Sequence, residues 1–151
     1  MTQILPTNKY LNQYRIIESE LCTKCAVRSD TVLHRLWQCQ LLVPYRDKIL
    51  TFLTQQCQIQ ENISLKAYMF GFSKNQGLNH TLLELKKLIF YTWDPNIEID
   101  AFLDLFIDKI RKLIIKEKQC VVSNKLYDQF NTKWENFKII YDFNGPDLQI
   151  F

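Results

Sequence analysis

Glycine and proline are scarce in this 151-residue chain, with three and four occurrences. An all-β sandwich needs many such residues in its turns, so their scarcity argues against that fold. Apolar runs long enough for a transmembrane helix are missing. The first residues also lack the basic-then-apolar order of a signal peptide. We therefore expect an intracellular protein, cytoplasmic or nuclear, with no membrane partner and with cysteines kept as thiols or metal ligands.

Hydrophobic residues, in contrast, are abundant. They make up 47% of the chain, and aromatic residues make up 13%. A chain of this length and composition can bury a core as one domain, so we do not expect disorder. The formal net charge of +3 is too small by itself to identify a nucleic-acid partner.

Apolar residues recur at helical spacing along most of the chain, and five helices are predicted, with a short amphipathic piece at residues 64–70 between the second and the third. The expected ranges of the helices are 8–18, 41–56, 78–93, 98–120 and 123–137. A short strand is expected at residues 139–141. The predicted fold is an all-α helical bundle with a small N-terminal CCHC zinc finger. Residues 1–45 would hold the first helix and the finger, and residues 46–151 would form a helical region packed with them as one domain.

The strongest motif is Cys22-x2-Cys25-x8-His34-x4-Cys39. Zinc prefers four tetrahedral sulfur and nitrogen ligands, and paired short spacings of this kind are typical of zinc sites. Three thiolates and one imidazole leave no open position, so we expect Zn²⁺ in a structural site. The alternative is a set of unrelated buried thiols with a hydrogen-bonded histidine.

The other cysteines and the second histidine carry weaker patterns. Cys57 and Cys120 lie alone on apolar helix faces and are interpreted as core thiols. His80 stands near a predicted helix start, which favours a surface or capping contact. Aspartates at positions 100, 104 and 108 share an exposed helix face without a nearby histidine or glycine-rich loop, so we expect no enzyme.

Several segments around the metal motif carry a family resemblance. They are Leu5-Pro6-Thr7-Asn8, Cys22-Thr23-Lys24-Cys25, and the run from Asp30-Thr31 through Trp37 to Cys39. Together they resemble the C-terminal zinc-binding (CCHC-type) region of the reverse transcriptase polyproteins of non-LTR (LINE-type) retrotransposons. Asn124-Lys125-Leu126 and Lys133-Trp134 extend the resemblance downstream.

The resemblance implies a non-catalytic domain that binds RNA, or an RNA–DNA hybrid, during target-primed reverse transcription. It also implies a reverse transcriptase core as a partner. The Tyr-x-Asp-Asp turn of the polymerase is missing here. Pro146-Asp147 leaves no room for the later residues of the nuclease found in some related elements. The alternative function is a structural or protein-interaction module that docks on a polymerase core or another partner.

Two basic groups are the candidate nucleic-acid contacts. The first surrounds the metal motif and consists of Lys24, Arg28, Arg35, Trp37, Arg46 and Lys48. The second consists of Lys109, Arg111, Lys112 and Lys116. Trp37 could stack on a base, although packing against the bundle is the favoured interpretation of an aromatic at helical spacing. The second group could equally be a solvated helix face whose charges suit the helix dipole.

Overall fold

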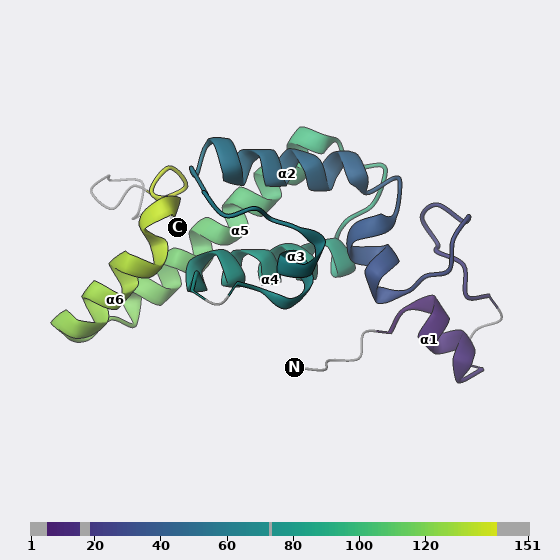
Figure 1. The fold of residues 1–151 in the computed structure, drawn as a ribbon, viewed down its shortest axis with the longest axis horizontal. Helices are drawn as coiled ribbons and strands as arrows, with labels where there is room; N and C mark the ends of the chain where they lie inside the picture. Colours follow the sequence, from purple (N-terminus) through teal and green to yellow (C-terminus); the bar gives the residue numbers. More distant parts are fainter. Residues whose placement is uncertain (1–5, 16–18, 73, 142–151) are drawn as a thin grey trace.

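Helices make up nearly all of the regular structure in the computed structural model, which describes residues 6–15, 19–72 and 74–141 (Figure 1). The elements are α1 (Asn8–Gln13), the π-helix η1 (His34–Gln38), α2 (Val43–Gln55), α3 (Leu65–Phe70), α4 (Gln76–Tyr91), α5 (Ile99–Gln119), α6 (Asn124–Trp134) and the 3₁₀ turn η2 (Glu135–Phe137). The described residues contain no strand, and one isolated antiparallel bridge joins Leu21 to Ser29. The all-α prediction is confirmed.

Side-chain caps fix where several helices begin. Thr7, Ser64, Asn75 and Ser123 each accept a hydrogen bond from a backbone N–H in the first turn of α1, α3, α4 and α6. Such caps satisfy donors that have no partner inside the helix. The helix α2 instead has a proline in its first turn, where the missing N–H costs nothing.

The helix α5 is the central element and packs against α2, α4 and α6. Its fully buried residues follow the helical repeat at Phe102, Phe106, Ile110 and Ile114. Burial of each such side chain contributes roughly 1.5–3 kcal/mol. Near the start of α2, the Tyr45 hydroxyl donates to the carbonyls of Pro95 (3.0 Å) and Ile97. This contact joins α2 to the loop before α5.

Close packing and a polar network hold α6 on α4 and α5. A Cβ at Gly77 would lie 2.1 Å from the Lys133 carbonyl oxygen, so only glycine allows α4 to approach α6 this closely. Glu117 of α5 accepts hydrogen bonds from Lys133 Nζ (2.8 Å) and Trp134 Nε1 (2.9 Å). Lys133 Nζ also lies 3.2 Å from His80 Nδ1 on α4.

Two secondary-structure predictions are wrong. The first helix ends at Gln13 because Arg15 adopts a positive φ of 58°, which breaks the helix; residues 16–18 lie outside the described part. The strand expected at 139–141 is a turn, in which the N–H groups of Ile140 and Tyr141 donate to the Phe137 carbonyl. The last predicted helix continues only to Trp134 before it tightens into η2.

The core-thiol prediction is confirmed for Cys57 and wrong for Cys120, and the prediction for His80 is wrong. Cys57 is a core thiol, 2% exposed, and burial raises its pKa to about 12. Cys120 is exposed because it follows the end of α5, six residues beyond Ile114 and off the buried face. His80 is a half-buried member of the network between α4, α5 and α6, and Asn75 caps α4 instead.

Candidate metal centre

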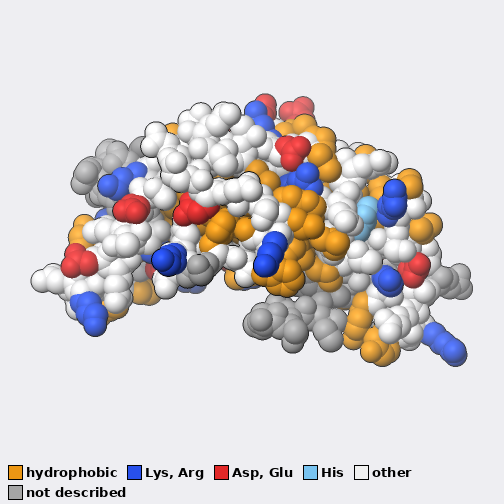
Figure 2. All heavy atoms as spheres, in the orientation of Figure 1, with side chains coloured by type: hydrophobic (Ala, Val, Ile, Leu, Met, Phe, Trp, Pro, Cys, Tyr) orange, Lys and Arg blue, Asp and Glu red, His pale blue; other side chains and the backbone are white. Residues whose placement is uncertain are grey.

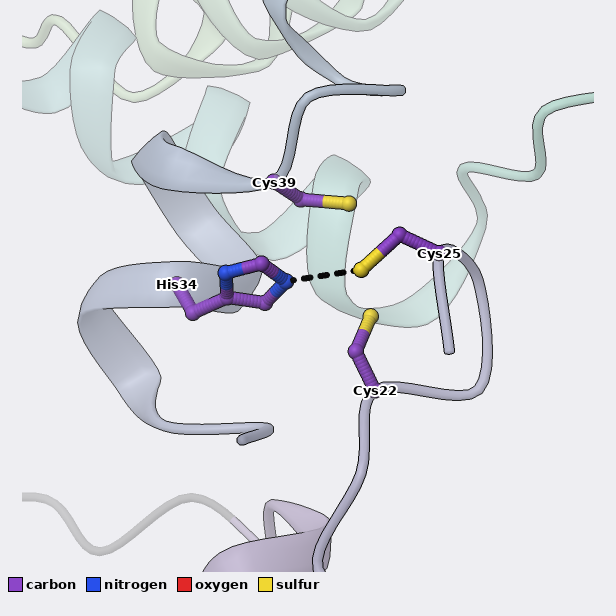
Figure 3. Close-up of side chains that lie close together, drawn as sticks. All are labelled: Cys22, Cys25, His34 and Cys39. Carbon is purple, nitrogen blue, oxygen red and sulfur yellow. Dashed lines mark hydrogen bonds between the residues drawn. The ribbon is translucent and has the colours of Figure 1, made fainter. Parts of the chain in front are cut away.

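Cys22, Cys25, His34 and Cys39 converge on one point (Figure 3). Their ligand atoms all lie within 4.8 Å of one another, and Cys25 Sγ lies 3.3 Å from His34 Nε2. A tetrahedral zinc ion with ordinary bond lengths would separate its ligand atoms by about 3.5–3.8 Å. The four side chains are therefore close enough to hold a metal ion, and three sulfurs with one nitrogen favour zinc.

Local backbone structure brings the four side chains together. The first two cysteines lie in a tight loop closed by the Cys22 N–H donating to Arg28 (2.8 Å) and the Ala26 N–H donating to Cys22 (2.9 Å). Ala26 takes a positive φ of 55° to make this turn. The π-helical turn η1 carries His34 at its start, and the Cys39 N–H donates back to the His34 carbonyl. One turn of helix therefore brings His34 and Cys39 to the same side.

The site is buried against the helical bundle. Cys22 is 2% exposed, His34 4% and Cys39 1%, and both cysteines belong to the same hydrophobic core as α2, α4 and α5. Four protein ligands and little solvent access are typical of structural zinc sites. Metal binding at this place would link the N-terminal segment to the rest of the fold.

Burial and backbone donors set the protonation of the ligands. Burial raises the pKa of the Cys39 thiol to about 11. At Cys25, burial opposes ionisation, but N–H groups of Val27 and Arg28 outweigh it and lower the pKa. Burial, with the nearby Arg28 and Arg35 cations, also lowers the pKa of His34, which stays neutral and able to bind a metal at pH 7. A divalent cation would stabilise the thiolates that burial otherwise disfavours.

A buried ion pair between Asp30 and Arg35 lies beside the metal centre. Asp30 is fully buried and holds Arg35 through two hydrogen bonds, one of them from Nε at 2.9 Å. The same carboxylate accepts the Asn8 N–H at the start of α1 (2.5 Å). The Arg35 guanidinium also lies over the Phe90 ring of α4. Asp30 and Arg35 thus join α1, η1 and α4.

Most of the predicted nucleic-acid contacts near the metal centre pair with other groups of the chain. Lys24 pairs with Asp94 at 3.6 Å, and Lys48, whose side chain stays 48% exposed, pairs with Asp100 at 3.5 Å. Arg46 lies over the Trp37 ring and donates to the Trp37 carbonyl.

Trp37 itself is half-buried against Tyr68, so the packing interpretation of this tryptophan is confirmed. Arg28 differs from the cations named above. It is exposed beside an open hollow of about 390 Å³ next to His34.

The second predicted group is more exposed. Lys112 pairs with Asp108 at 2.9 Å along α5 but stays 61% exposed, and Lys116 is exposed. Lys109 lies 3.7 Å from Glu84, and Arg111 donates to the Ile140 carbonyl. The two predicted groups therefore lie on different parts of the elongated molecule, the first around η1 and the second along α5 (Figure 1).

Sequence reasoning missed three exposed residues that could join the second group. They are Lys125, Tyr127 and Lys138. Tyr127 is 44% exposed on α6. The excess of basic over acidic residues after residue 108 was the signal that could have identified Lys125 and Lys138.

Comparison of the chain with protein-family models, with curated proteins and with solved structures gave no match. Among the described residues, no helix is long and apolar enough to cross a membrane.

Proposed function

We propose that this chain is a zinc-stabilised, non-catalytic RNA-binding domain whose RNA-binding surface is the basic hairpin, defined as residues 109–141. In this proposal Cys22, Cys25, His34 and Cys39 hold a structural Zn²⁺ that fixes the fold. The basic hairpin, which is the second half of α5 with α6 and η2, supplies the charge. The resemblance to non-LTR retrotransposon proteins supports RNA as the polyanion and a reverse transcriptase core as the wider setting.

The observation that carries the proposal is the segregation of charge along the chain. The basic hairpin holds eight lysines and arginines and three acidic residues, a net charge of +5. Residues 43–108 hold six basic and eight acidic residues, a net charge of −2. A local excess of this size attracts phosphates, although the whole chain is only mildly basic.

The side chains of the basic hairpin are suitably exposed for phosphate contact. Lys112, Lys116, Lys125 and Lys138 are all exposed. Tyr127 adds a ring on which an unpaired base can stack. Figure 2 shows lysines and arginines at the α6 end of the molecule, with acidic side chains among them, and others at the α1 end. Since Arg35 and Arg46 are largely buried and Lys24 pairs with Asp94, we assign the finger a scaffold role.

A salt titration of binding to single-stranded RNA tests this proposal. The variant Lys112→Glu/Lys116→Glu should bind more weakly, and the slope of log K against log salt should fall by about 1.4, because each phosphate contact contributes about 0.7. The matched control is Lys66→Glu/Lys87→Glu, which makes the same charge change on α3 and α4. Equal losses in both variants would show that net charge alone attracts RNA, and an unchanged slope in the hairpin variant would place the contact elsewhere.

A specific observation favours the alternative, a module that docks on a polymerase core or another protein. Phe70 of α3 is 85% exposed and Leu65 is 37% exposed. Hydrophobic side chains gather near α3 in the middle of the face drawn in Figure 2. Exposed apolar groups of this kind mark protein contacts. Zinc-loaded, folded protein that binds no RNA at low salt would support this alternative.

A further inference from the structure

Exposure to solvent differs among the four residues of the metal centre. Cys22, His34 and Cys39 are each 4% exposed or less. Cys25 is only partly buried, and its thiol lies nearer the surface than the Cys39 thiol. Cys25 is therefore the cysteine of the site that small molecules in solution reach most easily.

An open hollow lies on the Cys25 side of the metal centre. Its volume is about 390 Å³, and Cys25, Arg28 and His34 belong to its wall. Cys22 and Cys39 line a different hollow of about 100 Å³, but both residues offer almost no surface to solvent. A small reagent therefore approaches the sulfur atoms of the site from the side of Cys25.

The surroundings of Cys25 are those of a reactive thiol. Backbone N–H groups of Val27 and Arg28 donate to its sulfur, and the exposed Arg28 side chain lies beside the same hollow. Reactive cysteines are found in partly exposed, electropositive surroundings of this kind. Cys57, in contrast, is buried in the apolar core and lacks both features.

A second sulfur atom lies close to that of Cys25. The ligand atoms of the four residues are all within 4.8 Å of one another, which includes the sulfurs of Cys22 and Cys39. A disulfide forms when one sulfur of such a pair is oxidised and the thiolate of the other attacks it. Oxidation at Cys25 would therefore remove two ligands from the site.

We propose that Cys25 is a redox switch of the metal centre and the sulfur that hydrogen peroxide oxidises first. The Cys25 thiolate attacks one peroxide oxygen, the O–O bond breaks, and a sulfenic acid and hydroxide form. The thiolate of Cys22 or Cys39 then attacks the Cys25 sulfur, a disulfide forms, and a second hydroxide leaves. Two thiolates thus lose two electrons to one peroxide, and the site loses its Zn²⁺. The inference rests on the zinc site of the proposed function and is independent of RNA binding.

Peroxide titration of the zinc-loaded Cys120→Ser protein tests the proposal. This background removes the exposed Cys120 thiol, which would consume peroxide in a separate reaction. A chromophoric chelator follows zinc release, and peptide mass mapping identifies the disulfide, which should contain Cys25. A cyclic diketone, which traps sulfenic acids, should label Cys25 and leave Cys22 and Cys39 unlabelled.

Exchange of one cysteine ligand for histidine gives a matched pair of variants in the same background. Cys25→His keeps four zinc ligands but removes the accessible thiolate, so peroxide should release zinc about tenfold more slowly. Cys39→His makes the same exchange at a buried ligand and keeps Cys25, so the release rate should stay close to that of the background protein.

Three results would overturn the proposal. They are diketone labelling of Cys22 or Cys39 in preference to Cys25, a disulfide that lacks Cys25, and equal rates of zinc release from the two histidine variants. The labelling uses the unaltered metal site, so it decides the question where a histidine variant fails to fold. Protein that holds no zinc before peroxide is added would overturn both this inference and the metal part of the proposed function.

Discussion

The ion pair between Asp30 and Arg35 gives the most quantitative prediction. The Asp30 side chain is 0% exposed and that of Arg35 is 19% exposed, so loss of the cation leaves a buried carboxylate without its partner. Removing one partner of a buried pair costs about 3–5 kcal/mol. The variant Arg35→Met keeps much of the side-chain length but removes the charge and both hydrogen bonds, and it should lose stability in this range.

Urea denaturation of zinc-saturated protein measures this loss. With an m-value of about 2 kcal/mol/M, the midpoint should fall by about 2 M. The control Lys112→Met breaks an exposed pair with Asp108 and should cost less than about 1 kcal/mol. The double variant Asp30→Asn/Arg35→Met should be less destabilised than the sum of its single variants, because no charge remains buried. A loss below about 1 kcal/mol for Arg35→Met would refute this reasoning.

Three further predictions address α6, His80 and the metal. The variant Gly77→Ala should lower the melting temperature, because its Cβ would clash with the Lys133 carbonyl at 2.1 Å and force α6 away at a cost of about 1–3 kcal/mol; an unchanged melting temperature would contradict the close approach. Burial and the Lys133 ammonium lower the pKa of His80 below its ordinary 6.5, so the unfolded chain binds the proton first as the pH falls. The stability that His80 contributes is complete above pH 6.5 and is lost as the pH falls. His80→Gln should therefore lose less unfolding free energy than the wild type between about pH 7.5 and pH 5.5, whereas equal losses would contradict it. Chelation of zinc and the variant Cys22→Ser should both abolish amide protection over residues 19–42, since metal-binding energy is folding energy in such sites; retained protection would show that the metal is not structural.

The sequence predicts best where one local pattern decides the structure. Repeated apolar residues predict α5 and its buried face, including Phe102 and Phe106. The helix predicted at 41–56 appears as α2, and Pro44 lies in its first turn. The cysteine and histidine spacing predicts the four side chains that the fold brings together. In each case the information lies within a few turns of chain.

The sequence predicts poorly where a distant contact or one backbone angle decides. The positive φ of Arg15 ends α1 against a continuing apolar pattern. The carboxylate of Asp30 captures Arg35, which from charge alone was a candidate RNA contact. Trp93 lines the same hollow as Cys22 and Cys39 only because α4 packs against η1. Periodicity contains no information about such pairings.

X-ray absorption at the zinc edge of the purified protein tests the central claim most directly. The account predicts one zinc per chain with three sulfur ligands at about 2.3 Å and one nitrogen ligand at about 2.0–2.1 Å, and no oxygen ligand. A site with a bound water, a different ratio of sulfur to nitrogen, or protein without zinc would contradict a closed structural centre formed by Cys22, Cys25, His34 and Cys39.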